Sequence, residues 1–374
     1  MDTAPTSPNP ANPANPANPA NPANPANPAN PANPANSALA DKLASPVDAS
    51  TARHIALNTG AFSVKPGQTL LHAALAAGVS VPYSCQRGAC GSCRVRVVSG
   101  SHERIRPATA DGFRVAEDEL LMCQCRPTSD MRLHVPDWTP KPVPRIDLSA
   151  ADAPAWEQVG EGFDLRGVLE ARRLSIEAVE RIGRLMTPGM TTQQGLDAAE
   201  RCLREMGSIR TWHPTYIRFG ADAQFPWNRP LDRARVLRER DVIVVDIGPV
   251  WGEYEGDYGD TFVVGDDPEH QACARAAREI HAETRAEWAR GLTGVELYDF
   301  AAARASARGY ELVPEVAGHR IADFPHALYG KQDLAKAGFA PAHGLWVLEI
   351  QIRQPERQIG AFYEDVLLGE EALA

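Results

Sequence analysis

The stretch from Asp241 to Phe262, DVIVVDIGPVWGEYEGDYGDTF, constrains the fold of this chain more than any other. Its β-branched run VIVVD is typical of a buried strand, GPVWGEYEG supplies the glycine and proline of a turn, and DYGDTFVVG returns alongside as a second strand. We therefore expect Asp246 and Asp257 to face one pocket. Two buried carboxylates repel each other unless a cation compensates them, so the paired strands predict a metal site.

An aspartate at a strand end is, however, more often a turn former or a helix cap than a ligand. Three later residues favour the metal. His319 lies in a loop after the strand-like LVPEV, Glu349 ends the apolar run LWVLE, and Glu364 interrupts AFYEDVLL. Carboxylates with an imidazole suit two closely spaced Mn, Fe, Co or Zn ions rather than a structural thiolate site.

Residues from about 165 to 370 resemble the methionine aminopeptidase and Xaa-Pro dipeptidase superfamily, whose fold is called pita-bread. The eleven-residue step from the first ligand aspartate to the second is the same here. The resemblance implies that Asp246 binds the first ion and that Asp257 and Glu364 bridge the two ions. It implies that His319 and Glu349 complete the second ion. It also implies that His326, seven residues after His319, contacts the substrate near the scissile bond.

One position departs from this family. Its peptidases usually carry another catalytic histidine eighteen residues before the first ligand aspartate, and here that residue is Asn228. Asparagine cannot transfer a proton as imidazole does. Either His213, in TWHPTYIRFG, takes over this catalytic role, or the chemistry is not ordinary peptide cleavage.

A second motif lies nearer the N-terminus. Cys85, Cys90 and Cys93 have the C-x4-C-x2-C spacing of plant-type [2Fe–2S] ferredoxins, and Cys123 follows after 29 intervening residues. Cys125 is a near neighbour of this fourth position. Zinc would favour paired C-x2-C units and disulfides would suit a secreted protein, so the spacing predicts an iron–sulfur cluster.

The residues around these cysteines alternate between short strands and one helix. HIALN and FSV, the helical PGQTLLHAALAAGV, then CRVRVVSG and MRLHVP follow the order of a small β-grasp domain. This segment resembles the ferredoxin domain fused to reductases of the phthalate dioxygenase type. No G-x-G-x-x-G follows a strand and no P-loop occurs, so we expect an external electron donor or acceptor protein.

The domain organisation follows from composition. We expect an α+β protein made of a disordered Pro-Ala-Asn-repeat tail, a β-grasp domain, a Pro-rich linker and a pita-bread domain, at residues 1–53, 54–138, 139–160 and 161–374. Apolar residues at three- and four-residue intervals predict amphipathic helices near residues 164–190 and 191–207, and two further helices are expected near residues 267–288 and 294–307. Cys202 and Cys273 lie in these helical patterns and are expected to be buried packing residues.

The net charge of −10 and the pI near 5.5 argue against nucleic acid or an anionic membrane surface as a partner. No run of 18 apolar residues and no basic start with an apolar core is present, so we expect a cytoplasmic protein. A homodimer is compatible with these features.

Together the two motifs predict an electron-transfer domain fused to a dimetal hydrolase. In that reading a hydroxide bridging the metals attacks the C–N amide bond of a small peptide or amide, Glu349 manages protons, and His326 orients the substrate. The alternative is a non-catalytic scaffold or binding module attached to the ferredoxin domain.

Overall fold

The computed structural model describes residues 52–105, 115–141, 153–329 and 332–369 of the 374-residue chain. These residues belong to one compact unit. The predicted repeat tail and the middle of the predicted linker lie outside the described residues. We call residues 52–105 and 115–141 the cysteine domain, and residues 153–329 and 332–369 the carboxylate domain.

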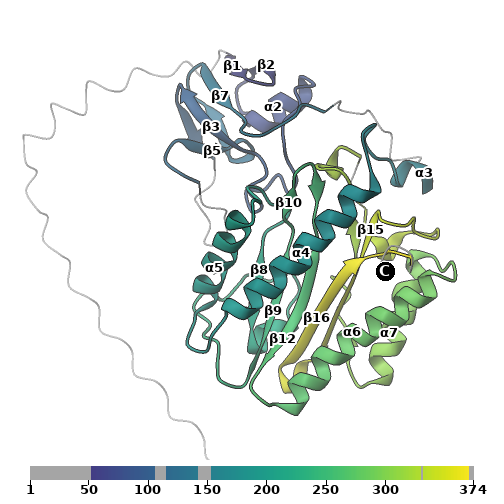
Figure 1. Ribbon diagram of the computed structural model, residues 1–374. Coiled ribbons are helices and arrows are strands. Elements are labelled where there is room, and N and C mark those ends of the chain that lie inside the picture. The colour runs from purple at the N-terminus through teal and green to yellow at the C-terminus, as the bar shows by residue number, and fades with distance from the viewer. Residues whose placement is uncertain (1–51, 106–114, 142–152, 330–331, 370–374) are drawn as a thin grey trace, which may run out of the picture. The chain divides into compact units, whose positions relative to one another are not determined.

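The cysteine domain is built on a five-stranded sheet in the order β2-β1-β7-β3-β5 (Figure 1). Strand β1 pairs in parallel with β7 and antiparallel with β2. The strands are β1 Arg53–Leu57, β2 Gly60–Val64, β3 Arg94–Ser99, β4 His102–Arg104, β5 Glu119–Leu121, β6 Cys125–Pro127 and β7 Met131–His134, of which β4 and β6 form a separate pair. The helix α2, Leu70–Ala76, and the 3₁₀ turn η1, Met122–Gln124, complete the domain.

The expected β-grasp arrangement is confirmed. Its core forms because alternate side chains of a strand lie on one face. Alternate residues of β1, Ile55 and Leu57, are buried and belong to the same apolar cluster as Leu70 and Leu71 of α2. The helix is shorter than the predicted segment. It starts after Thr69, whose side chain accepts a hydrogen bond from the backbone N–H of His72.

The carboxylate domain contains a seven-stranded sheet in which the order is β13-β15-β16-β12-β9-β8, with β14 also paired to β15. The strands of this domain are β8 Tyr216–Phe219, β9 Asp241–Ile247, β10 Val250–Trp251, β11 Tyr254–Glu255, β12 Tyr258–Val264, β13 Glu311–Leu312, β14 His319–Arg320, β15 Trp346–Gln354 and β16 Ile359–Val366. The small hairpin of β10 and β11 joins β9 to β12, which run antiparallel as the opening motif predicted.

The four predicted helices are all present, at α4 Leu165–Leu185, α5 Thr192–Glu205, α6 Pro268–Trp288 and α7 Gly294–Ala307. Capping boxes at Thr191 and Thr293 begin α5 and α7, and Asp267 caps α6 ahead of a proline. The short elements are α3 Ala153–Trp156, η3 Gly220–Gln224, η4 His326–Tyr329, η5 Leu334–Lys336 and η6 Pro355–Arg357. Cys202 and Cys273 are buried in α5 and α6, as expected.

The side chains of strand β9 point alternately to the two faces of the sheet. Ile243 and Val245 pack in the same apolar cluster as Val179 and Ile182 of α4, which lies across the sheet with α6 (Figure 1). Since successive side chains of a strand alternate between faces, Asp246 lies on the face opposite α4. The helices therefore cover one face and leave the other for the polar residues.

Two local predictions differ from the structure. The strand-like LVPEV contributes only Leu312 to a strand, because Pro314 has no N–H to donate to the ladder. His319, expected in a loop, lies in the two-residue strand β14 and pairs with Val347. Among the described helices, none is both long and apolar enough to cross a membrane.

Candidate functional site

The sheet register aligns the acidic residues in one row. Asp246 lies opposite Gly259, Gly259 lies opposite Glu364, and Glu364 lies opposite Glu349, so the row crosses β9, β12, β16 and β15. Residues directly opposite on antiparallel strands project from the same face. Asp257, two residues before Gly259, shares that face because side chains alternate with a period of two. Four carboxylates thus converge from strands that are distant in sequence.

Gly259 makes room in the middle of this row. A Cβ atom at this position would lie 2.7 Å from Glu364 Oε1 and 2.5 Å from Phe362 Cε1. The space between Asp246 and Glu364 therefore depends on the absence of a side chain at Gly259.

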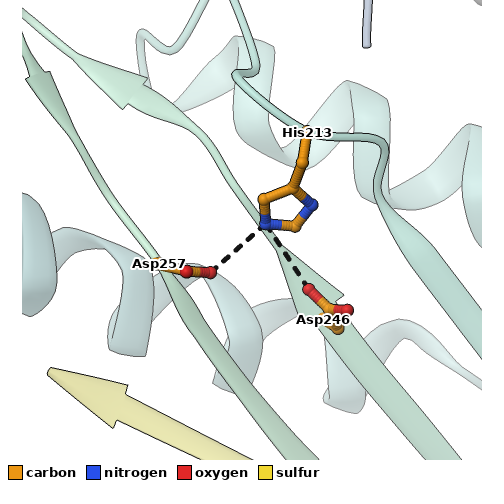
Figure 2. A group of neighbouring side chains, drawn as sticks. All are labelled: His213, Asp246 and Asp257. Atoms are coloured by element: carbon orange, nitrogen blue, oxygen red, sulfur yellow. Dashed lines mark hydrogen bonds and ion pairs between the residues drawn. The ribbon is translucent and has the colours of Figure 1, made fainter. Parts of the chain in front are cut away.

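Two histidines approach the central carboxylate from opposite sides. His213 Nε2 lies 3.2 Å from Asp257 Oδ1 and 3.6 Å from Asp246 Oδ1 (Figure 2). His319 Nε2 lies 3.0 Å from Asp257 Oδ2 and 3.6 Å from Glu349 Oε1. Each oxygen of Asp257 therefore faces one imidazole nitrogen, as expected of a carboxylate placed between two ions.

The donor atoms fit a pair of metal ions. Three buried carboxylate oxygens have no hydrogen-bond donor within the described residues: Asp246 Oδ1, Asp257 Oδ2 and Glu364 Oε1. Asp257 Oδ2 is close to His319 Nε2 but lacks hydrogen-bond geometry with it. Two overlapping groups have ligand atoms within 4.8 Å of one another, namely His213, Asp246 and Asp257, and Asp257, His319 and Glu364. Buried anionic oxygens without donors are costly, and bound cations would satisfy them.

The pKa values of these groups show how strongly the site favours positive charge. Burial raises the pKa of Asp246 to about 7, and burial followed by repulsion from Asp257 raises that of Glu364. Burial also opposes ionisation of Asp257, but the neighbouring His319 and His213 lower its pKa to about 2. Burial would lower the pKa values of both histidines, yet the carboxylates raise them to about 10 for His319 and about 9 for His213. Protons on the imidazoles supply the positive charge that metal ions would otherwise bring.

His326 is fixed by a residue that the sequence analysis missed. Glu255 accepts hydrogen bonds from the Nδ1 of His326 at 2.7 Å and from its backbone N–H at 2.9 Å. Burial lowers the pKa of His326 despite the opposing Glu255 carboxylate, which favours a neutral ring. The signal in the sequence was the acidic residue two positions before Asp257, which the strand pattern alone assigned no role.

Trp212 is the second residue missed. Its indole N–H donates to the carbonyl of Gly256 at 2.9 Å, and its ring centroid lies 4.5 Å, 4.9 Å and 5.3 Å from the rings of His213, His319 and His326. It is the one side chain among the described residues with ring contacts to all three histidines. Its position next to His213 in the chain was the available clue.

The predicted site residues of the carboxylate domain lie close together. Asn228, at the position of the family's additional histidine, lies elsewhere. A cavity of about 370 Å³ is lined by His213, Asp246, His319, His326 and Glu349, among others. Asn228 is exposed and lines a different cavity of about 430 Å³. The residue that replaces the family's histidine therefore does not line the carboxylate cavity.

The four predicted cluster cysteines form two pairs. Side-chain hydrogen bonds join Cys85 to Cys90 and Cys93 to Cys123. Two pairs of sulfur atoms suit the four thiolates that hold a [2Fe–2S] cluster. Cys125 instead lies in β6, where it pairs with Arg104. The structure thus brings Cys123, rather than its neighbour, to the other three cysteines.

The loop around these cysteines directs backbone N–H groups toward sulfur. The N–H groups of Arg87 and Cys90 donate to Cys85 Sγ at 3.5 Å and 3.4 Å. The thiol of Cys90 and these N–H groups lower the pKa of Cys85 to about 5. Gly88 has a φ of +85°, and a Cβ there would lie 2.7 Å from Gln124 Cγ. The close wrapping of the loop therefore requires glycine and favours bound thiolates.

These features define a protein with two metal-binding centres, an iron–sulfur cluster held by a cysteine loop and a dimetal site on a sheet. The chain belongs to metallopeptidase family M24, whose family model matches residues 166–370. Residues 55–128 match the 2Fe-2S iron-sulfur cluster binding domain.

Curated relatives match the cysteine domain. The alkene monooxygenase system ferredoxin–NAD(+) reductase component of Xanthobacter autotrophicus is 45% identical over 84 residues, which are 21% of this chain and 25% of that protein. Terephthalate 1,2-dioxygenase reductase component 2 of a Comamonas species is 35% identical over 97 residues, covering 26% of this chain and 27% of that protein. The chain thus spans about a quarter of the length of these relatives.

Solved structures match the carboxylate domain. A prolidase from Pyrococcus horikoshii aligns with a TM-score of 0.46 and 20% identity over 57% of this chain and 60% of the prolidase. A methionine aminopeptidase from Thermotoga maritima aligns with a TM-score of 0.43 and 14% identity over 60% of this chain and 99% of the aminopeptidase.

The α+β architecture of a ferredoxin domain followed by a pita-bread domain is therefore established, as are its cofactors. The first domain carries a [2Fe–2S] cluster, and the second belongs to a family that uses a dimetal centre.

Proposed function

We propose that the carboxylate domain is a metal-dependent hydrolase that cleaves the C–N amide bond of a small peptide or amide, while the cysteine domain transfers single electrons. One observation carries this proposal. All five family ligand positions hold a ligand residue, and three of their oxygens are buried without a hydrogen-bond donor. A domain that had lost its metal would have no reason to keep such costly groups together.

The proposed ligands are Asp246, Asp257, His319, Glu349 and Glu364. A pair of divalent ions held there would polarise the substrate carbonyl and supply a water-derived nucleophile near neutral pH. Glu349 is less enclosed than Glu364, with its side chain 13% exposed, and it lines the cavity. It is therefore placed to accept a proton from the attacking water and return it to the leaving amine.

The proposed substrate-contacting residue is His326. Because Glu255 holds the Nδ1 side of the ring, Nε2 is left for a substrate atom in the cavity that His326 lines. A neutral imidazole held in one orientation can position a carbonyl or donate a hydrogen bond to the oxygen that becomes negative.

His213 supplies the imidazole that position 228 lacks. It comes from the segment before β8 and approaches from the side of Asp246 and Asp257. We propose that it acts at the metal pair in place of the family's missing histidine.

One observation favours a second candidate, a non-catalytic binding module. Asn228 is exposed and cannot transfer protons, so the usual catalytic set is incomplete. In that case the metals would be bound but no amide would be cleaved.

The deciding experiment uses the full chain, stripped of metal and reloaded with Mn, Fe, Co or Zn. Each form is incubated with dipeptides, aminoacyl amides and amidines, and released amines are measured by chromatography. Metal-dependent cleavage that Glu349→Gln abolishes is expected, with His343→Ala, an exposed histidine, as the matched control. Two bound ions per chain without cleavage of any substrate would contradict the hydrolase and leave the binding module.

A further inference from the structure

The loop that carries the cluster cysteines is bonded to the segment that carries His213. Ser92 Oγ donates to the carbonyl of Thr211 at 2.7 Å, and Thr211 Oγ1 donates to the carbonyl of Cys90 at 2.7 Å. Ser92 Oγ also lies 3.0 Å from Cys90 Sγ. Thr211 is thus joined to the cluster loop by two hydrogen bonds, one with the predicted ligand Cys90 and one with Ser92. Arg94 adds a third bond, to the carbonyl of Ile209 at 2.8 Å.

Two residues further along the chain, this segment reaches the carboxylates. Trp212 is buried, with 7% of its surface exposed, and its indole is held by the hydrogen bond to Gly256. Its ring contacts the imidazoles of His213 and His319. The residue between Thr211 and His213 therefore carries an aromatic ring that contacts both imidazoles facing Asp257.

His213 is oriented in the same way as His319, a ligand position of the family. The Nδ1 of His213 lies 2.7 Å from the carbonyl of Pro214, and the Nδ1 of His319 lies 3.0 Å from that of Arg320. A backbone carbonyl that takes the Nδ1 proton leaves Nε2 free to bind a metal, and ligating histidines commonly have such a partner. The two Nε2 atoms then face the two oxygens of Asp257.

The cluster loop and the carboxylate row line one cavity. Cys85 and Arg87 of the cluster loop line the cavity of about 370 Å³ together with His213, Asp246 and Glu349. Both centres therefore open on one space.

We propose that Thr211–His213 is an electron-transfer connection, in which Thr211 holds the cluster loop, His213 is a sixth ligand of the metal pair, and Trp212 couples the two centres. One electron leaves the reduced cluster, which becomes [2Fe–2S]²⁺, and a ferric ion bound at His213 becomes ferrous. No bond is formed or broken and no proton moves. Carboxylates with two imidazoles are a ligand set that suits iron. This redox role does not depend on hydrolysis.

The electron-transfer test uses the oxidised full chain, with either iron or zinc loaded at the carboxylate site. A photoreduced flavin supplies less than one electron per chain under anaerobic conditions, and the cluster is followed by absorbance and by electron paramagnetic resonance of frozen samples. With iron, we expect the reduced cluster to reoxidise at a rate that does not depend on protein concentration. With zinc, it should stay reduced. A cluster that stays reduced in both forms, or a rate proportional to protein concentration, would overturn the proposal.

Two variants locate the connection. Trp212→Leu should lose the concentration-independent phase while retaining its iron. Trp288→Leu, in α6 with its indole N–H bonded to the carbonyl of Pro341, should behave as the parent protein. Equal rates in both variants would exclude Trp212. His213→Ala should lose tight binding of one of two zinc ions by elemental mass spectrometry, and full zinc content in this variant would exclude His213 as a ligand. His343→Ala serves as the control.

Discussion

Glu349 and Glu364 lie directly opposite each other on the antiparallel strands β15 and β16, and both carboxylates project into the metal site. Like charges at opposed positions destabilise a sheet. Burial and the neighbouring carboxylates raise the pKa of Glu364, so the metal-free protein avoids the repulsion by keeping a proton there. The pair is favourable only when a cation replaces that proton.

The opposed pair Glu349 and Glu364 predicts that Glu364→Gln weakens metal binding without lowering the stability of the metal-free protein. The metal-free variant should unfold at the same temperature as the metal-free parent or higher, because the amide imitates the protonated acid. Adding zinc at about 100 times its dissociation constant should stabilise the parent by about 2.7 kcal/mol and the variant far less. Thermal unfolding with and without zinc measures both effects.

The control for this experiment is Glu356→Gln, an exposed change in η6. It should retain the full zinc-dependent stabilisation. If Glu364→Gln retained it as well, Glu364 would not be a ligand.

Gly259 gives a second prediction, because the row of carboxylates needs its missing side chain. Gly259→Ala would place a methyl group 2.7 Å from Glu364 Oε1. Glu364 must then move, so the variant should bind fewer than two ions per chain while remaining folded. Elemental mass spectrometry in a Cys90→Ser background, which removes the cluster iron, gives the count.

Gly338→Ala is the matched control, since a Cβ there meets nothing within 4 Å. An unchanged metal content in Gly259→Ala would show that the site tolerates the methyl group and that the row is not tightly spaced.

The cluster assignment is tested by comparing two neighbouring cysteines. Cys123→Ala should abolish the visible absorbance of the cluster, as should Cys90→Ser, without unfolding the carboxylate domain. Cys125→Ala should keep the absorbance, because Cys125 pairs with Arg104 in β6 and lies away from the other three cysteines. Absorbance together with iron and sulfide content decides the question. Loss of the cluster in Cys125→Ala but not in Cys123→Ala would reverse the assignment.

Much of the fold was predictable because its signals are local. Apolar periodicity indicated α4 and α5, and the β-branched run VIVVD indicated β9. The cysteine spacing likewise predicted a [2Fe–2S] cluster, which the match to the cluster-binding domain confirms.

The rest of the site depends on contacts that are distant in sequence. The alignment of Asp246, Gly259 and Glu364 follows from strand register, which no single segment encodes. Glu255 and Trp212 have hydrogen-bond partners more than 40 residues away, so their local sequence shows only that each lies near a candidate site residue. The hydrogen bonds of Thr211 with Ser92 and Cys90 join two domains and could not be predicted from the sequence either.

The final prediction concerns a buried histidine outside the metal site. His281 in α6 is 4% exposed and packs edge-on against Tyr363, and burial lowers its pKa to about 4. In the unfolded chain its pKa is near 6.5, so between pH 6.5 and 4 the unfolded state holds a proton that the folded state lacks. The free energy of unfolding should therefore fall as the pH drops through this window, by about 3 kcal/mol from His281 alone.

His281→Phe should remove that part of the pH dependence, because it keeps the ring contact with Tyr363 and cannot be protonated. Urea unfolding of the metal-free parent and variant at pH 7.5 and pH 4.5 measures the difference, and the titrating metal ligands contribute equally to both proteins. His343→Ala, an exposed histidine, should leave the parent's pH dependence unchanged. If the variant lost as much stability on acidification as the parent, His281 would have to be protonated in the folded protein, and the acid sensitivity would belong to the carboxylate site.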